Sequence, residues 1–137
     1  MNKIVKQVLL SLAAVLIIVF IIFVMSCVNK KKQSEENKLY NNLNMVTKEF
    51  YKDYYYPVVL YNNPEAAAAY KDKGIKLTLN ELANYKGNDR DSILSLFKNY
   101  KNGSNCDYNN TKVTIYPVDP YGKEDIRIDG AVVCGIN

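Results

Sequence analysis

The stretch CDYNNTKVTIYPVDPYGKEDIRIDGAVVC, residues 106 to 134, carries the clearest strand signals of the chain. Apolar and polar residues alternate at 113–115 and again at 126–128, which is typical of strands with one buried face. The DPYG sequence between them has Asp first, Pro second and Gly fourth, as a type I turn prefers. A hairpin centred on this turn places Val113 opposite Ile128, so the apolar faces of the two strands agree.

Two cysteines, Cys106 and Cys134, frame this hairpin, and its register brings them opposite each other with an offset of one residue. Strict alternation would put their side chains on opposite faces, so pairing needs a β-bulge at Gly130 or at Asn109-Asn110. Opposed strand positions lie about 4.5–5.5 Å apart, which is within disulfide reach. We therefore predict a Cys106–Cys134 disulfide that stabilises the fold by about 3 kcal/mol. Two free buried thiols are the alternative.

Upstream of the hairpin, the pattern predicts a long amphipathic helix. Apolar residues recur every three or four positions from Leu39 to Tyr54, which gives the helix one apolar face. The predicted helix covers 34–55, and Pro57 ends it because the residue before a proline is pushed out of helical geometry. Nothing between it and the apolar start of the chain breaks a helix, so the two can be continuous.

Short helices are predicted between the long helix and the hairpin. The sequence NPEA at 63–66 offers an N-cap, a first-turn proline and an acidic residue, and the next glycine ends the helix. The TLNE sequence at 78–81 is a capping box that opens another helix. A further helix is capped by Asp89 or Asp91. Residues 75–77 are expected to form an extended link.

Five tyrosines gather between residues 51 and 61. A tyrosine buries a large ring and keeps its hydroxyl in water, so packing in the core is the first interpretation. Three of them are consecutive and fan over about 200° on a helix, so at least one faces solvent. The cluster is therefore also the candidate interaction patch for a partner or a sugar. Its members are Tyr51, Tyr54, Tyr55, Tyr56 and Tyr61.

The start of the chain contains VLLSLAAVLIIVFIIFVMSCV, residues 8 to 28, which carries no charge. At about 1.5 Å per residue, a helix of this length crosses a hydrocarbon core of about 30 Å, so 1–28 is predicted to be a membrane anchor. Ser26-Cys27 also partly meets a bacterial lipoprotein signal, which would be removed up to residue 26 and leave a lipid on Cys27. The length of the apolar run favours the retained anchor, because signal peptides use about 7–15 apolar residues.

Charge separates the anchor from the rest of the chain. Of the 18 basic residues, five flank the apolar run, which leaves 13 against 14 acidic ones elsewhere. The positive charge is therefore a membrane feature, and no nucleic-acid partner is expected. We predict a polar juxtamembrane segment over 29–38 and a single α+β domain over 39–137. A disulfide needs an oxidising compartment, so the domain is predicted to lie outside the cytoplasm. The five flanking residues are Lys3, Lys6, Lys30, Lys31 and Lys32.

The chain has no histidine, which excludes histidine-based catalytic triads and histidine-containing metal sites. The sequence also lacks a glycine-rich phosphate loop and a metal-ligand cluster, so we expect neither an enzyme nor a cofactor or metal site. A glycan-cleaving enzyme that uses two carboxylates is the enzymatic alternative, although no pair stands out.

The order of these parts resembles that of type IV pilins and pseudopilin-like membrane-anchored proteins of Gram-positive bacteria. The similar stretches are IKLTLNELANYKG at 75–87 and the hairpin region at 106–135. The resemblance implies a pilin-like ectodomain behind a hydrophobic helix. Prepilins carry a Gly before their cleavage site and a Glu five residues into the apolar run. The run at 8–28 has neither, so filament assembly is not implied.

The predicted fold is α+β: a transmembrane helix leads into an amphipathic helix, short helices follow, and a disulfide-stapled antiparallel hairpin ends the domain. The expected function is that of a non-enzymatic, single-pass surface or interaction protein, with the membrane and other envelope proteins as partners. The alternative is a surface lipoprotein, lipidated at Cys27, that binds a ligand or partner.

Overall fold

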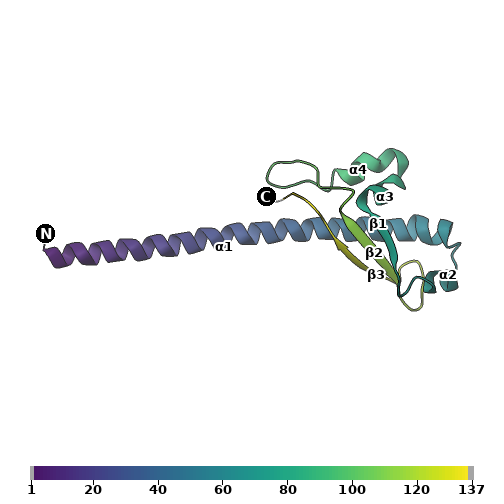
Figure 1. Ribbon diagram of the computed structural model, residues 1–137, viewed down its shortest axis with the longest axis horizontal. Helices are drawn as coiled ribbons and strands as arrows, with labels where there is room; N and C mark the ends of the chain where they lie inside the picture. The colour runs from purple at the N-terminus through teal and green to yellow at the C-terminus, as the bar shows by residue number, and fades with distance from the viewer. Residues whose placement is uncertain (1, 136–137) are drawn as a thin grey trace. The chain divides into compact units, whose positions relative to one another are not determined.

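The computed structural model describes residues 2–135 and has an α+β fold (Figure 1). The chain forms two compact units, Met1–Glu36 and Asn37–Asn137. Helix α1 (Lys3–Phe50) contributes to both units. The remaining elements belong to the second unit and follow in the order η1 (Tyr51–Val59), α2 (Pro64–Ala68), β1 (Ile75–Thr78), α3 (Leu79–Asn84), η2 (Gly87–Asp89), α4 (Arg90–Leu94), β2 (Lys112–Pro117) and β3 (Ile126–Ala131).

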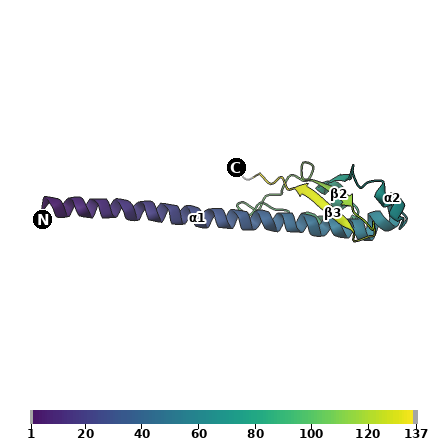
Figure 2. The same cartoon turned by 90° about the horizontal axis from the view of Figure 1, so that it is seen from below.

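The last part of α1 supplies the helical side of the domain core. Its predicted apolar face is confirmed from Leu39 to Phe50, since Leu39, Leu43, Val46 and Phe50 are all buried, whereas Tyr54, the last predicted member, is exposed. The sheet packs on this face, and both cartoon views show β2 and β3 lying across this part of α1 (Figure 2). Gly130 of β3 permits the close approach, because a Cβ there would lie 3.0 Å from Cδ2 of Leu43.

The predicted end of the long helix is wrong. The chain stays helical beyond Tyr55 as η1, a π-helix that includes Pro57 and ends at Val59. Pro57 lacks the N–H of an α-helical residue, and its ring would crowd the preceding turn. The wider π turn accommodates it, as shown by the Leu60 N–H, which donates to the Tyr55 carbonyl five residues back at 3.0 Å.

The predicted helix starts are confirmed at two places. The Asn63 side chain accepts hydrogen bonds from the backbone N–H groups of Glu65 and Ala66 and caps α2. In the capping box of α3, the Glu81 N–H donates to Thr78 Oγ1 at 3.2 Å, and the Thr78 N–H donates to Glu81 Oε2 at 2.7 Å.

Two other predictions about the short helices need correction. The α2 helix is shorter than predicted, because it ends at Ala68 and turns carry the chain to Gly74. Asp89 occupies the cap position of α4 but makes no capping hydrogen bond with its side chain.

The hairpin belongs to a three-stranded antiparallel sheet in the order β1-β2-β3. Residues 75–77, predicted to be an extended link, are part of β1 and pair with β2. Ile75 lies opposite Ile115, and Leu77 lies opposite Val113. Strand β1 has only four residues, so its own pattern is too short to reveal a partner. The pairing supplies that partner.

The hairpin register differs from the prediction by two residues. Val113 lies opposite Gly130 rather than Ile128, and Ile115 lies opposite Ile128 rather than Ile126. A shift of two residues keeps every side chain on its predicted face, because the strand repeat is two. The predicted type I turn is also wrong, since its third residue, Tyr121, has a φ of 63°.

A longer loop replaces that turn. The Val118 N–H donates to the Asp125 carbonyl at 2.8 Å, and the Gly122 N–H donates to Asp125 Oδ2 at 2.9 Å. These bonds close the loop around Asp125 and set the centre of the hairpin one residue later than the DPYG prediction.

Candidate functional site

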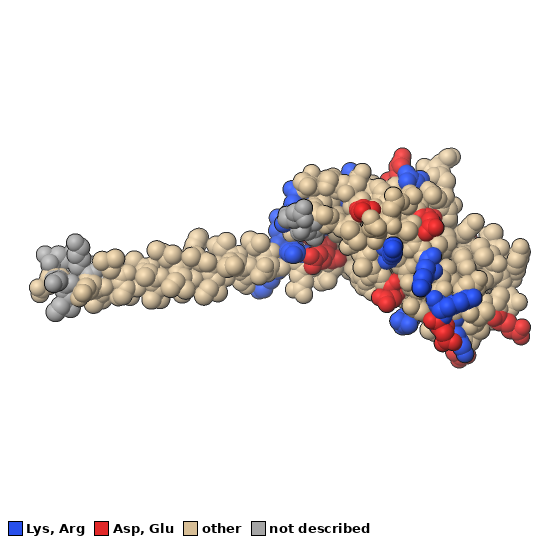
Figure 3. All heavy atoms as spheres, in the orientation of Figure 1, with Lys and Arg blue, Asp and Glu red and all other residues tan. Residues whose placement is uncertain are grey.

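The first part of α1 exposes a continuous apolar surface. One helix in the described part of the chain, α1, is long and apolar enough to cross a membrane, and none of its most apolar window is buried. Over 10–28, where the sequence carries no charge, only uncharged side chains show along α1 in Figure 3. The segment 29–38 continues the helix and is almost entirely exposed. Lys32 and Glu36 form an ion pair there, one helical turn apart, with an N–O distance of 3.8 Å.

Cys27 lies within α1 and is a free, exposed cysteine. Helical geometry continues on both sides of it, from Ser26 through Val28. An exposed thiol near the end of the apolar run is accessible for acylation and is also compatible with a cysteine of a retained anchor. Both interpretations of Cys27 therefore stand.

The predicted Cys106–Cys134 disulfide is formed, with an S–S distance of 2.06 Å and a Cα–Cα distance of 4.1 Å. Both cysteines are buried. The predicted bulge is absent, because the β2–β3 register runs without interruption from Lys112 to Pro117. No bulge is needed, since both cysteines lie outside the strands, where strict alternation does not apply.

The chain around the disulfide is also held by hydrogen bonds. The Asp107 N–H donates to the Val133 carbonyl at 2.7 Å, and the Asn99 side-chain amide donates to the Gly135 carbonyl at 2.6 Å. Hydrogen bonds from Asn110 hold the pKa of the Asp107 carboxyl below its usual value. The disulfide thus joins two stretches of chain that these hydrogen bonds already hold next to each other.

The five tyrosines of the predicted interaction patch do not share one surface. Tyr51 and Tyr56 are buried and Tyr55 is half-buried, so these three pack in or against the core. Tyr54 and Tyr61 are exposed, with 38% and 83% of their surface accessible. The expectation that at least one of the consecutive tyrosines faces solvent is confirmed by Tyr54.

The buried tyrosines form an aromatic cluster with neighbours from other elements. Phe50 and Tyr85 meet edge to face at 5.2 Å between ring centroids, and Tyr51 stacks on Tyr55 at 6.1 Å. Burial raises the pKa of Tyr51 and of Tyr55 to about 12 in each case. Within the described residues the Tyr51 hydroxyl has no hydrogen-bond partner. The cluster is built for packing, and a large part of the predicted patch is therefore unavailable to a partner.

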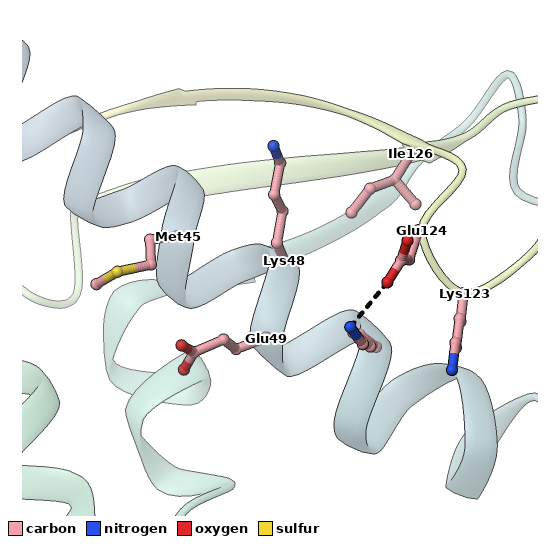
Figure 4. Close-up of a pocket in the computed structure, with 7 residues that line it drawn as sticks. Met45, Lys48, Glu49, Lys123, Glu124 and Ile126 are labelled. Carbon is pink, nitrogen blue, oxygen red and sulfur yellow. Dashed lines mark hydrogen bonds and ion pairs between the residues drawn. The ribbon is translucent and has the colours of Figure 1, made fainter.

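A groove of about 430 Å³ lies between the helical residues 45–52, where α1 continues into η1, and residues 123–126, where the hairpin loop ends and β3 begins (Figure 4). The side chains of Lys48 and Ile126 project into the space between α1 and β3 in this view. The four helical residues that line the groove, Met45, Lys48, Glu49 and Lys52, follow the i, i+3, i+4, i+7 pattern and so share one face. The lining residues are Met45, Lys48, Glu49, Lys52, Lys123, Glu124 and Ile126.

The charges of the groove are only partly matched. Lys52 Nζ lies 2.7 Å from Glu124 Oε1, and Lys86 Nζ lies 3.0 Å from Glu49 Oε2. The hydrogen bond from Lys52 holds the pKa of the Glu124 carboxyl below its usual value. Across the part of the chain that the structure describes, Lys48 and Lys123 belong to no ion pair. The groove therefore offers two free cations beside apolar surface, which suits an anionic ligand.

Sequence reasoning did not bring these groove residues together as one site. The only local signal is the spacing of Met45, Lys48, Glu49 and Lys52 on one helix face, and an exposed polar face of this kind is common. The loop that completes the groove lies more than seventy residues further along, as the Lys52–Glu124 contact spans 72 positions. Only the packed fold brings the two parts together.

Comparison with protein-family models, with curated proteins and with solved structures finds no match to this chain. The functional argument therefore depends on the residues and geometry described above.

Proposed function

We propose that this is a non-enzymatic, single-pass membrane protein whose C-terminal domain serves as an interaction module outside the cytoplasm. The observation that carries the proposal is the exposed, uncharged helical surface over 10–28, which is costly in water and favourable in a lipid bilayer. The domain beyond it has its own buried core, which contains no residue of 8–28.

The disulfide supports the extracytoplasmic location. Cytosolic thiols are kept reduced, whereas disulfides persist in secreted and extracellular proteins. A small domain also gains most from such a staple, because it buries a limited core. Cys106 and Cys134 are buried and bonded to each other, so they serve stability rather than redox chemistry in this proposal.

A pilin-like ectodomain remains part of the proposal. Its support is the order of parts: a hydrophobic helix that continues into the domain, then short helices, then a sheet closed by a disulfide near the end of the described chain. The proposal extends to the architecture and does not include filament assembly, because the run at 8–28 lacks both the Gly and the Glu of prepilins.

The first test is the intact mass of the detergent-extracted protein before and after reduction. A full-length, unacylated mass that gains two hydrogens on reduction supports a retained anchor and a stapled domain. A mass that begins at Cys27 and carries acyl chains would instead establish the lipoprotein alternative. A Cys27→Ser variant is the control, since it loses the acyl mass only if Cys27 is the lipid site.

The second test is the orientation of the domain. An epitope tag placed after Asn137 should be accessible to antibody on intact spheroplasts, without permeabilisation. Access only after permeabilisation would place the domain in the cytoplasm and would contradict the proposal.

A further inference from the structure

Strand β3 has a free edge. The sheet order is β1-β2-β3, so β3 pairs with a neighbour on one side only. Because the Val118 N–H donates to the Asp125 carbonyl, alternation along the antiparallel ladder directs the backbone groups of Arg127 and Asp129 toward β2. The N–H and C=O groups of Ile128 and Gly130 therefore point to the open side. No other segment in residues 2–135 pairs with them.

This free edge borders the groove described above. Ile126 begins β3 and also lines the groove, together with Met45 and Lys48 of α1 (Figure 4). A strand added beside β3 would continue the sheet over this exposed face of α1. If the added strand runs antiparallel to β3, its residues that hydrogen-bond to Ile128 and Gly130 lie directly opposite them and direct their side chains to the α1 side, because directly opposed residues share a face of the sheet.

The charge of the groove selects the side chains of such a strand. Lys48 and Lys123 are the groove lysines without an ion-pair partner in the described structure, whereas Glu49 and Glu124 are each neutralised by a lysine. Acidic side chains on the α1 side of an added strand would meet these two cations. Basic side chains there would be repelled, which distinguishes this surface from an edge that accepts any strand.

We propose that the free edge of β3, together with the groove, binds an extended acidic segment of another protein as a fourth strand that runs antiparallel to β3. Main-chain hydrogen bonds to Ile128 and Gly130 supply affinity, and the two lysines select acidic residues at alternate positions. This inference names the class of partner for the proposed interaction module, and it rests on that proposed function. Its test uses peptide binding in detergent, which succeeds or fails independently of the membrane topology.

The probe is a fluorescent synthetic peptide in which Glu and Val alternate, titrated into the full-length protein in detergent and followed by anisotropy. We expect saturable binding, protection of the Ile128 and Gly130 amides from hydrogen exchange, and weaker binding as salt is raised. A peptide with Lys in place of Glu should not bind.

Two N-methylated versions of the peptide test the strand geometry. Methylation of the Glu nitrogens should abolish binding, because in the proposed pose these N–H groups donate to β3. Methylation of the Val nitrogens should leave binding intact, because those N–H groups face solvent. Equal effects of the two modifications would overturn the proposed pairing.

The protein variant is Lys48→Ala/Lys123→Ala, for which we expect about three- to tenfold weaker binding of the acidic peptide. The matched control is Lys76→Ala/Lys98→Ala, which removes the same charge from exposed lysines away from the groove and should leave affinity unchanged. Failure of the acidic peptide to bind the unaltered protein would overturn the proposal. So would equal losses in the two variants. Protection of the Ile128 amide through self-association of the protein without peptide would also overturn it, because a second copy would then occupy the edge.

Discussion

Replacing both bridging cysteines with alanine should lower the stability of the domain by an amount that the loop length sets. Cys106 and Cys134 are 28 residues apart, and closing a loop of that size removes about 3.5 kcal/mol of entropy from the unfolded chain at 25 °C. For a domain of this size, that loss corresponds to a fall in Tm of roughly 15–25 °C. Alanine is preferred to serine because both sites are buried.

The folded state should change little in this variant. The hydrogen bonds from Asp107 to Val133 and from Asn99 to Gly135 remain available to hold the last segment in place. The loss of stability therefore arises in the unfolded ensemble, where the chain gains freedom once the staple is absent.

The assay is thermal unfolding of the full-length protein in detergent, followed by the near-ultraviolet circular dichroism of tyrosine. All 12 tyrosines lie outside 8–28, so the signal reports the domain and is insensitive to an anchor helix that stays folded in detergent. Cys27→Ala is the matched control and should unfold at the wild-type temperature, because Cys27 is free. Reductant should lower the Tm of the wild type and leave that of the double variant unchanged.

One result would refute the reasoning. If the double variant unfolds within about 5 °C of the wild type, the loop-closure argument fails, and the hydrogen bonds around the disulfide carry the stability instead.

Three further predictions concern individual residues. Thr78→Ala removes the capping box of α3 and should cost about 1 kcal/mol in chemical denaturation, whereas an unchanged midpoint would mean that the cap contributes nothing. Gly74→Ala should destabilise by more than about 1 kcal/mol, because Gly74 has a φ of +66° and a Cβ there would collide with Thr114; a stability equal to that of wild type would contradict this. Burial raises the pKa of Tyr51 and Tyr55 from 10.0 to about 12, so the folded state favours the neutral phenols. The free energy of unfolding that this preference contributes is fully present below pH 10 and is lost as the pH rises toward 12. Phenolate absorbance should therefore rise together with the loss of tyrosine dichroism, and titration of all tyrosines near pH 10 without unfolding would exclude this.

Features that depend on neighbouring residues were predictable from the sequence. The capping box at 78–81 and the Asn63 cap form as expected, because each requires only backbone N–H groups two or three residues away. The apolar run at 8–28 and the buried face from Leu39 to Phe50 follow from the helical repeat in the same way. The disulfide was also predictable, since an approximate hairpin register was enough to bring two cysteines together.

Features that depend on distant residues were decided by the tertiary structure. Strand β1 is a strand only because β2 pairs with it, and an isolated four-residue stretch carries too little information to show this. The predicted hairpin register was wrong by two residues. A shift of two residues keeps every side chain on the same face, so alternation alone cannot distinguish the two registers. The continuation of the helix through Pro57 likewise overrides the local preference of proline.

The candidate site shows the same division. The sequence by itself determined that the chain has an apolar segment long enough for a membrane and a small cysteine-stapled domain, because composition and short-range spacing encode both. Packing decided which tyrosines are buried, that β3 has an open edge, and that Lys48 and Lys123 line one groove with Ile126 of β3. The physical reason is that burial and charge pairing depend on which surfaces meet, and contacts between residues more than seventy positions apart leave no periodic trace in the chain.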